Sequence, residues 1–214
     1  PELPGALELV ERLTSAGVVV AAGHTTADLE ATRLAFAAGV RYVTHLFNAM
    51  PGLHHRDPGP VLAALGDPRV VVGMIPDGIH VHPDLVRLVR DVVGAGRFSA
   101  VTDAMSAMGM PPGRYPMGAF TIEVDETSAR QENGTLAGSV LTLDAAVRNL
   151  VTFTGARPEE ALLAVTEVPA ALLREESGRL ALGAPADLVL LDPELNVRAT
   201  VVGGDVVWDA ETDR

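Results

Sequence analysis

Cysteine and lysine are both absent from the 214-residue sequence, in which all 16 basic residues are arginine. Without cysteine, the chain has no disulfide, no thiol nucleophile and no cysteine-ligated zinc. Without lysine, it has no Schiff-base amine, no lysine of a phosphate-binding Walker loop and no carboxylated-lysine bridge between metals. The chemistry open to this chain therefore rests on histidine, aspartate, glutamate, serine, arginine and a bound metal.

Long apolar runs and positive charge are also scarce. No stretch of 18 or more apolar residues is present, so we expect no membrane span, and the acidic first residues do not have the layout of a signal peptide. The net charge of −12 argues against nucleic acid and anionic membranes as partners. The lack of cysteine is compatible with a cytoplasmic location, which we predict.

Hydrophobic residues make up 48% of the sequence, and they form apolar strands that alternate with amphipathic helices. Four near-continuously apolar segments predict parallel strands covered on both faces: residues 18–22, 40–46, 70–76 and 99–102. Helices are predicted before the first strand, after a cap formed by Thr25 and Asp28, over 85–93, around 143–150 and from Pro158. This α/β alternation indicates either an open doubly wound sheet or a (β/α)8 barrel, and both collect chemistry at the carboxyl ends of strands.

The chain changes character after Asp103. Residues 105–118 are rich in methionine, glycine and proline, which predicts a loop. Short strands are predicted at 121–124 and 134–136, and the last forty or so residues are β-rich.

Four ionisable residues end the four predicted parallel strands. His24, His45 and His80 follow the first three strands, and Asp103 ends the fourth. A single histidine at a strand end is most often structural, but parallel strands bring all four ends to one face, which favours a functional site. The other three histidines are expected to be exposed loop residues: His54, His55 and His82.

These residue types suit metal-assisted hydrolysis. Two neutral imidazoles, His24 and His45, suit a borderline metal such as zinc, although a third protein ligand is needed. Asp103 could serve as general base and acid, and His80 could donate to a carbonyl oxygen. Arg56, in the loop after His45, is a candidate anion clamp, although a lone arginine is more often a solvated surface residue.

Several segments together resemble one enzyme family. GHTTAD, THLFNAMPGLHHRDPG, DGIHV, VTDA, ENGTLAGS and VRNLV are similar to the N-acetylglucosamine-6-phosphate deacetylase family of the amidohydrolase superfamily. The tail GRLALGAPADLVLLD is similar to amidohydrolases in general. The resemblance implies a metal-dependent (β/α)8 TIM barrel with a small β-sandwich, usually a homodimer.

The resemblance also implies roles for individual residues. His24 and His45 match two metal ligands on barrel strands five and six, and Asp103 matches the catalytic aspartate. His80 matches the residue that contacts the acetamide carbonyl. Arg56 matches an arginine that reaches across from the neighbouring subunit and pairs with the sugar phosphate. The remaining matches are substrate-binding positions: Asn48, Ala49, Asp77, Gly78, Ile79, Leu136, Ala137 and Gly138.

The family's third metal ligand is a glutamate on an earlier strand, and four strands precede those found here. We therefore expect the C-terminal half of the barrel, strands five to eight, in residues 1–175, and returning strands of the β-sandwich in residues 176–214. A full barrel takes about 250 residues. We expect this chain alone to be incomplete as an enzyme.

The implied reaction is the deacetylation of N-acetylglucosamine 6-phosphate to glucosamine 6-phosphate and acetate. The attacking water would be activated by a divalent metal, zinc or else iron(II) or cobalt. One alternative is an amidohydrolase that acts on another N-acyl or cyclic amide. A second alternative is a non-catalytic fragment that keeps the site residues unused.

Overall fold

Residues 1–118 and 120–212 are described by the structure, a computed structural model. At its centre is a parallel sheet of four short strands in the order β1-β2-β3-β4. The strands are β1 (Val20–Ala22), β2 (Val40–Val43), β3 (Val71–Met74) and β4 (Phe98–Ala100). This sheet confirms the predicted α/β class. Each strand is shorter than predicted: β1 begins later, at Val20, and β2, β3 and β4 end earlier, at Val43, Met74 and Ala100.

Helices precede and connect these strands, and two of them begin at a proline, of which Pro158 is the predicted start. Pro83 opens α4 (Pro83–Val93) and Pro158 opens α6 (Pro158–Leu163), where a missing N–H costs nothing. The others are α1 (Ala6–Ser15), α2 (Leu29–Ala38), α3 (Gly59–Gly66), the 3-10 turn η1 (Ala95–Arg97), α5 (Leu143–Thr154) and α7 (Glu167–Leu173). In the described part of the chain, none of the helices combines the length and apolar character needed to cross a bilayer.

The cap predicted at the start of α2 is formed differently. Asp28 alone is the cap, and its carboxylate accepts a hydrogen bond from the Ala31 N–H at 2.8 Å. The Thr25 hydroxyl instead accepts from the Ala27 N–H and donates to Glu2 at 2.5 Å. Thr25 therefore fastens the loop that follows β1 and does not begin the helix.

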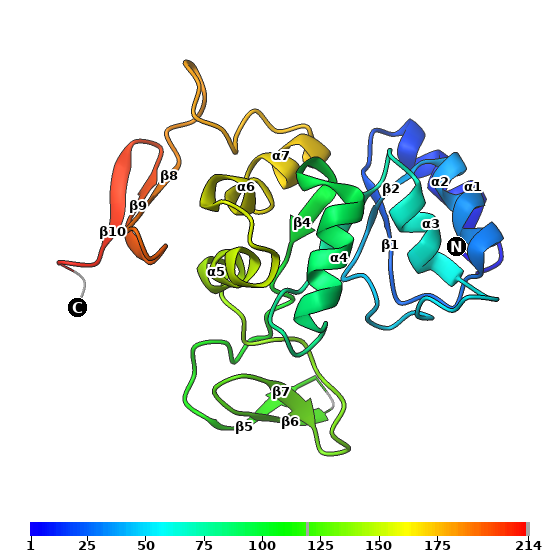
Figure 1. Ribbon diagram of the computed structural model, residues 1–214, viewed down its shortest axis with the longest axis horizontal. Helices are drawn as coiled ribbons and strands as arrows, with labels where there is room; N and C mark the ends of the chain where they lie inside the picture. The colour runs from blue at the N-terminus through cyan, green and yellow to red at the C-terminus, as the bar shows by residue number, and fades with distance from the viewer. Residues whose placement is uncertain (119, 213–214) are drawn as a thin grey trace.

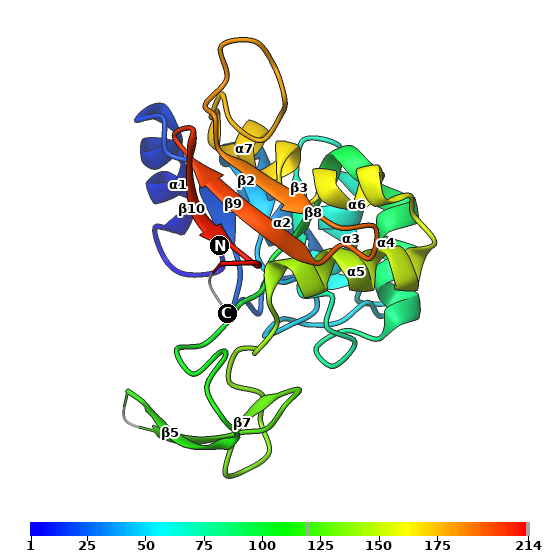
Figure 2. The same ribbon diagram turned by 90° about the vertical axis from the view of Figure 1, so that its left-hand side faces the viewer.

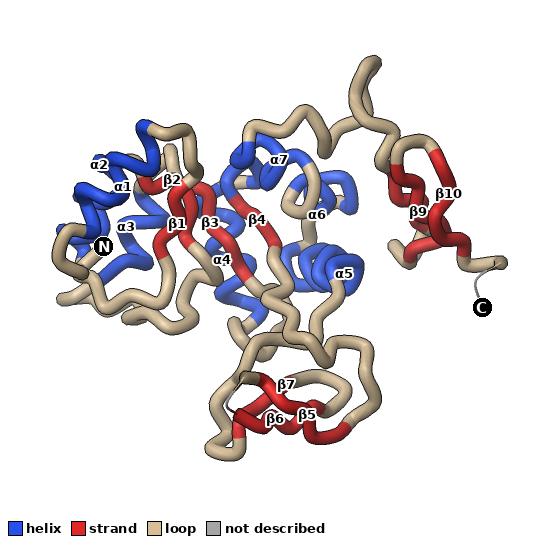
Figure 3. Tube along the Cα trace, turned by 180° about the vertical axis from the view of Figure 1, so that it is seen from behind, coloured by secondary structure: helices blue, strands red, loops and turns tan. Residues whose placement is uncertain are grey.

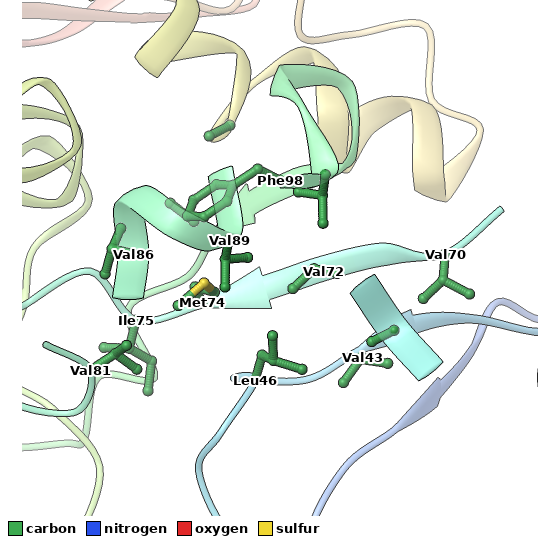
Figure 4. Close-up of a cluster of buried hydrophobic side chains, with 14 of the residues drawn as sticks. Val43, Leu46, Val70, Val72, Met74, Ile75, Val81, Val86, Val89 and Phe98 are labelled. Carbon is green, nitrogen blue, oxygen red and sulfur yellow. The ribbon is translucent and has the colours of Figure 1, made fainter. Parts of the chain in front are cut away.

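The helices cover one face of the parallel sheet. Helix α4 lies in front of the strands in Figure 1, whereas the strands face the viewer when the molecule is seen from behind in Figure 3. Figure 4 shows the layer between them, where Val86 and Val89 of α4 meet Val72, Met74 and Phe98. All five side chains are fully buried, and burial of each contributes about 1.5–3 kcal/mol. This layer fixes the strands whose ends carry the candidate site.

A small antiparallel sheet follows β4, and the sequence predicted it only in part. Its strands are β5 (Gly113–Met117), β6 (Phe120–Val124) and β7 (Ala129–Gln131), below the main body in Figure 1. The prediction of a loop over 105–118 was wrong for β5. The strand predicted at 134–136 is an isolated bridge between Leu136 and Arg130.

The C-terminal segment forms a third sheet, as its β-rich pattern predicted. The antiparallel strands β8 (Leu188–Leu191), β9 (Val197–Val202) and β10 (Asp205–Asp209) lie in the order β10-β9-β8. They are set apart from the helices in Figure 1 and lie in front of the main body in the turned view of Figure 2. The consecutive residues Val189 and Leu190 are 56% and 51% exposed. Because consecutive strand residues point to opposite faces, both faces of this sheet present apolar surface.

Candidate active site

The carboxyl ends of the parallel strands bring the predicted ionisable residues to one edge of the sheet. His24 follows β1, His45 follows β2, Asp77 and His80 follow β3, and Asp103 follows β4. The strands are parallel and adjacent in this order, so their carboxyl ends share an edge. The sequence predicted this common edge, and the roles of the individual residues stay predictions.

At three of these residues the backbone has a conformation that is rare for residues other than glycine. The φ angles are 46° at His24, 30° at His45 and 48° at Asp103, all in the left-handed region. Such a conformation costs a non-glycine residue about 1–2 kcal/mol and is maintained only by surrounding contacts. Strain of this kind is concentrated at functional sites, and here it occurs at the ends of three of the four strands.

His24 and His45 form a close pair. Their Nε2 atoms are 3.0 Å apart, and the rings meet edge to face with centroids separated by 4.8 Å. His45 is buried and its Nδ1 has no hydrogen-bond partner, whereas His24 is exposed. The two Nε2 atoms therefore converge at a point that solvent reaches from the His24 side.

This pair fits a divalent metal as two of its ligands. Imidazole nitrogens are common ligands of zinc, iron and cobalt, and a shared cation would satisfy the lone pairs of both Nε2 atoms. Among residues 1–118 and 120–212, however, no three His, Asp or Glu side chains are grouped as a complete metal site. The described residues thus supply two nitrogens of a site that needs at least one more ligand.

Asp77 and His80 form the second close pair. The Asp77 Oδ2 lies 2.5 Å from the His80 Nδ1, and the Asp77 Oδ1 accepts the backbone N–H groups of Ile79 and His80, each at 2.8 Å. Burial raises the pKa of Asp77, but the hydrogen bonds from His80 and Ile79 outweigh it and hold the pKa below its ordinary value. An ionised Asp77 fixes the orientation of the His80 ring.

Two residues of α5 lie against the loop that follows β3. The Asn149 side chain donates to the Pro76 carbonyl at 2.9 Å, immediately before Asp77. Gly78 has φ of 76°, and a Cβ there would lie 3.3 Å from the Phe153 ring. Asp77, Gly78 and Ile79, which were predicted to bind substrate, are here the turn that holds His80.

Asp103 is exposed at the end of the β4 segment and lies beside the predicted substrate loop 136–138. The backbone of Ser139 pairs with this segment: Ser139 N–H donates to the Asp103 carbonyl at 2.8 Å, and Met105 N–H donates to the Ser139 carbonyl at 2.9 Å. Of the predicted loop, Ala137 is buried and Leu136 and Gly138 are half-buried. The structure thus brings the loop to Asp103, as a substrate-binding role would need.

Asn48 and Ala49 lie in the turn that follows His45. The Asn48 side chain donates to the carbonyls of His45 and Leu46, each at 3.3 Å. The Ala49 carbonyl accepts from the Thr25 N–H at 3.1 Å, which links the loops after β1 and β2. Both residues therefore stabilise the arrangement of the histidine pair, and their contact with substrate stays a prediction.

Arg56 is exposed in the loop that precedes α3. Its Nη1 lies 2.8 Å from the His55 Nε2. In the described part of the chain it makes no hydrogen bond or ion pair with the histidine pair, His80 or Asp103. The structure therefore leaves its guanidinium available at the surface and does not join it to the other site residues. His54 and His55 are exposed, as predicted, whereas the exposed His82 also caps α4 through Asp84 N–H.

Three supporting residues were missed by sequence reasoning. Glu2 accepts from the Thr25 hydroxyl and from the Thr26 N–H at 2.8 Å, bonds that lower the pKa of Glu2 below its ordinary value. Ser139 and Asn149 hold the Asp103 and Asp77 segments. Ser139 and Asn149 belong to ENGTLAGS and VRNLV, so the resemblance had marked their segments, but their backbone partners are distant in sequence.

Comparison with known families gives one match over nearly the whole chain. The model of the family described as "Amidohydrolase family" matches residues 2–207. This range includes each residue of the candidate site.

Individual relatives are similar across the whole chain but extend beyond it. The chain is 40% identical over 222 residues to the N-acetylglucosamine-6-phosphate deacetylase of Bos taurus, covering 100% of this chain and 54% of that protein. It is also 40% identical, over 208 residues, to the N-acetylgalactosamine-6-phosphate deacetylase of Escherichia coli O157:H7, covering 96% of this chain and 55% of that protein. The chain thus spans about half the length of the curated relatives it matches.

A solved structure supports the same relationship in three dimensions. A mutant N-acetyl-D-glucosamine-6-phosphate deacetylase from Mycobacterium smegmatis, in complex with N-acetyl-D-glucosamine-6-phosphate, aligns with a TM-score of 0.92 at 43% identity. The alignment covers 97% of this chain and 56% of that chain.

Proposed function

The chain belongs to the amidohydrolase family, and from this premise we propose that it carries the catalytic edge of a deacetylase. The reaction is the hydrolysis of N-acetylglucosamine 6-phosphate to glucosamine 6-phosphate and acetate. One observation carries the proposal: four adjacent parallel strands present His24, His45, His80 and Asp103 at one edge of the sheet. The deacetylases at about 40% identity support the choice of substrate.

His24 and His45 would hold a divalent metal through their Nε2 atoms, which lie 3.0 Å apart. When bound, such a metal supplies a Lewis acid that lowers the pKa of a water molecule and polarises a carbonyl. We propose zinc, with iron(II) or cobalt as alternatives that imidazole ligands also accept.

Asp103 is assigned the proton transfers. As an exposed carboxylate at the strand end, it can accept a proton from the attacking water and deliver it to the leaving nitrogen of the amide. Breaking the C–N bond then yields acetate and the free amine of the sugar.

His80 is assigned to the acetyl oxygen. Its Nδ1 lies 2.5 Å from the Asp77 carboxylate, so Nε2 is the ring nitrogen that remains to face the substrate. An N–H at Nε2 would donate to the oxygen on which negative charge develops, an interaction that grows in strength as the reaction proceeds.

Substrate binding is assigned to loops around these groups. Arg56 would pair with the sugar phosphate, and its exposed position in a surface loop suits a contact made across a homodimer. Asn48, Ala49 and the loop 136–138 would contact the sugar. The solved relative from Mycobacterium smegmatis contains the phosphorylated sugar, which supports this class of ligand.

For the whole protein we propose a (β/α)8 barrel of which residues 1–175 form strands five to eight. Residues 176–214 would return to a small β-sandwich. The sheet β8–β10 supports this division, because both of its faces present apolar side chains that a second sheet would cover.

N-acetylgalactosamine 6-phosphate is the second candidate substrate. The relative from Escherichia coli that bears this name is as similar to the chain, at 40% identity, as the Bos taurus protein is. The two sugars share the acetamide and the phosphate, so every role assigned above applies to both.

The test is acetate release by the full protein with added zinc. The substrates are N-acetylglucosamine 6-phosphate, N-acetylgalactosamine 6-phosphate and N-acetylglucosamine without phosphate. We expect turnover of the first to exceed that of the unphosphorylated sugar. Faster turnover of the second would transfer the proposal to the galactosamine substrate, and equal turnover with and without phosphate would overturn the phosphorylated class.

A further inference from the structure

The strained backbone of Asp103 needs an external support. Its φ of 48° lies in the left-handed region, which disfavours a residue with a Cβ. Asp103 is also exposed, so packing of its own side chain contributes little to holding this conformation. The support must come from groups that contact the backbone on either side of it.

Ser139 contacts the backbone on both sides of Asp103. Its N–H donates to the Asp103 carbonyl at 2.8 Å, and its carbonyl accepts from the Met105 N–H at 2.9 Å. Its hydroxyl donates to the Thr102 carbonyl and accepts from the Leu141 N–H at 3.0 Å. Four hydrogen bonds thus meet at one residue that is 1% exposed. Two of them depend on its side chain, and one of these two reaches Thr102, the residue before Asp103.

The approach of Ser139 depends on the glycine before it. Gly138 has φ of 74°, and a Cβ at this position would lie 2.9 Å from the Asp103 carbonyl oxygen. Glycine therefore allows the two backbones to come close. The segment before Ser139 is also bonded to the small sheet, because Ala137 N–H donates to the carbonyl of Ala129 in β7 at 2.9 Å.

We propose that Ser139 is a positioning residue for Asp103. The Ser139 hydroxyl fixes the position of the Thr102 carbonyl and so orients the catalytic carboxylate of Asp103. The role rests on the proposed function, because it presumes that Asp103 transfers protons. Ser139 itself touches no substrate. Its effect is to keep the Asp103 backbone in a conformation that it would otherwise leave.

The experiment compares Ser139→Ala with Ser128→Ala in the full protein loaded with zinc. Ser128 is a matched control: it is also a buried serine beside the small sheet, but its hydroxyl bonds to Asp125 at 3.1 Å and does not contact the Asp103 segment. A misplacement of about 1 Å can cost about 100-fold in rate, so for Ser139→Ala we expect kcat on N-acetylglucosamine 6-phosphate to fall by about 10–100-fold. KM and bound zinc should stay near their wild-type values, and Ser128→Ala should keep wild-type kcat.

A second variant separates positioning from folding. Ser139→Cys keeps a donor of similar size, but a thiol donates more weakly than a hydroxyl, so its kcat should lie between those of wild type and Ser139→Ala. If Ser139→Ala does not fold, Ser139→Cys alone must show the loss in kcat at constant KM. Equal kcat for wild type and the folded Ser139 variants overturns the positioning role while the deacetylase function stands. A wild-type protein without turnover overturns the function, and with it this role.

Discussion

The Asp77 carboxylate holds the His80 imidazole by a contact of 2.5 Å between Oδ2 and Nδ1. The same carboxylate accepts two backbone N–H groups through Oδ1, so it both stabilises the turn and orients the imidazole ring. A histidine whose Nδ1 is bonded to a carboxylate has only Nε2 free to contact a ligand. The pair therefore resembles the arrangement in which a carboxylate fixes the tautomer of an active-site histidine.

Replacing Asp77 by asparagine should reduce catalysis without unfolding the turn. The amide oxygen can still accept the N–H groups of Ile79 and His80, but the amide nitrogen cannot accept from Nδ1, so the ring loses the bond that orients it. We expect Asp77→Asn to lower kcat by about 10–100-fold with little change in KM, in the range found for groups that orient a histidine. Steady-state kinetics on N-acetylglucosamine 6-phosphate measure this.

Asp84 offers a matched control for that change. It also lies beside a histidine, with its Oδ2 3.7 Å from the His82 Nδ1, but both side chains are about 70% exposed: 70% for His82 and 71% for Asp84. Asp84→Asn should keep wild-type kcat. Equal kinetics for the Asp77 and Asp84 variants would contradict the orienting role of Asp77.

The sheet was predictable because parallel strands buried on both faces have one recognisable pattern. The valine-rich segments before His24, His45 and Asp77 are apolar without alternation, and each became a strand. Strand β5 was not predictable, because Gly113 and Pro116 occur within its five residues and both are unusual in strands. Strand β7 is only three residues long and has no β-branched or aromatic residue.

The site was predictable where it depends on residue type at a strand end, and not where it depends on distant backbone groups. His45 and Asp103 could be picked out because an ionisable residue follows an apolar strand. The supports could not: Ser139 bonds to a carbonyl 37 residues away, and Asn149 bonds to one 73 residues away. Every residue has a backbone carbonyl, so the sequence does not show which one a distant side chain will bond. Such a partner becomes evident only in the folded structure.

Arg56 should affect binding of the phosphate and not the chemical step. For Arg56→Ala we expect KM for N-acetylglucosamine 6-phosphate to rise by about 10-fold or more, from loss of about 1.5–3 kcal/mol of charged hydrogen bonding, with kcat nearly unchanged. Turnover of the unphosphorylated sugar should not change. Steady-state kinetics on both sugars measure this difference.

Arg87 provides the control for Arg56, because it is an exposed arginine on α4 whose partner is Asp84 at 3.1 Å. Arg87→Ala should keep the wild-type KM. If Arg56→Ala raises KM equally for the phosphorylated and unphosphorylated sugars, Arg56 does not recognise the phosphate.

Arg97 should matter for stability and not for catalysis. Its guanidinium donates to the carbonyls of Ala64, Leu65, Asp67 and Val70 at 2.7–3.3 Å, which joins the end of α3 to the start of β3 at the edge opposite the site. Arg97→Ala leaves these half-buried carbonyls without their donor. We expect the free energy of unfolding to fall by about 2–3 kcal/mol, measured by urea denaturation.

The control for Arg97 is Arg69, which is 52% exposed at its side chain and pairs with Asp67 at 2.6 Å. An exposed pair contributes about 0–1 kcal/mol, so Arg69→Ala should have a small effect. The kcat of folded Arg97→Ala should equal that of wild type. A stability loss no larger than that of Arg69→Ala would contradict the structural role.

Tyr42 should ionise at unusually high pH. Burial raises its pKa to about 12, and the hydrogen bond with Ser99 opposes this only in part. Its ring lies over β3, where a Cβ on Gly73 would come within 2.0 Å of the Tyr42 hydroxyl oxygen. The pKa is raised in the folded state, so the stability that Tyr42 contributes is complete below pH of about 10 and is lost as pH rises toward about 12.

The composition makes this titration easy to isolate. The chain has two tyrosines and neither lysine nor cysteine, so few side chains ionise between pH of about 9 and 12. Tyrosinate absorbance at 295 nm, in wild type minus Tyr42→Phe, should give a midpoint near 12, with far-UV circular dichroism at each pH to follow the fold. Urea denaturation should show that the stability difference between the two proteins is constant up to pH of about 10 and becomes smaller above it. A midpoint near 10 in a protein that is still folded would mean that water reaches the Tyr42 hydroxyl.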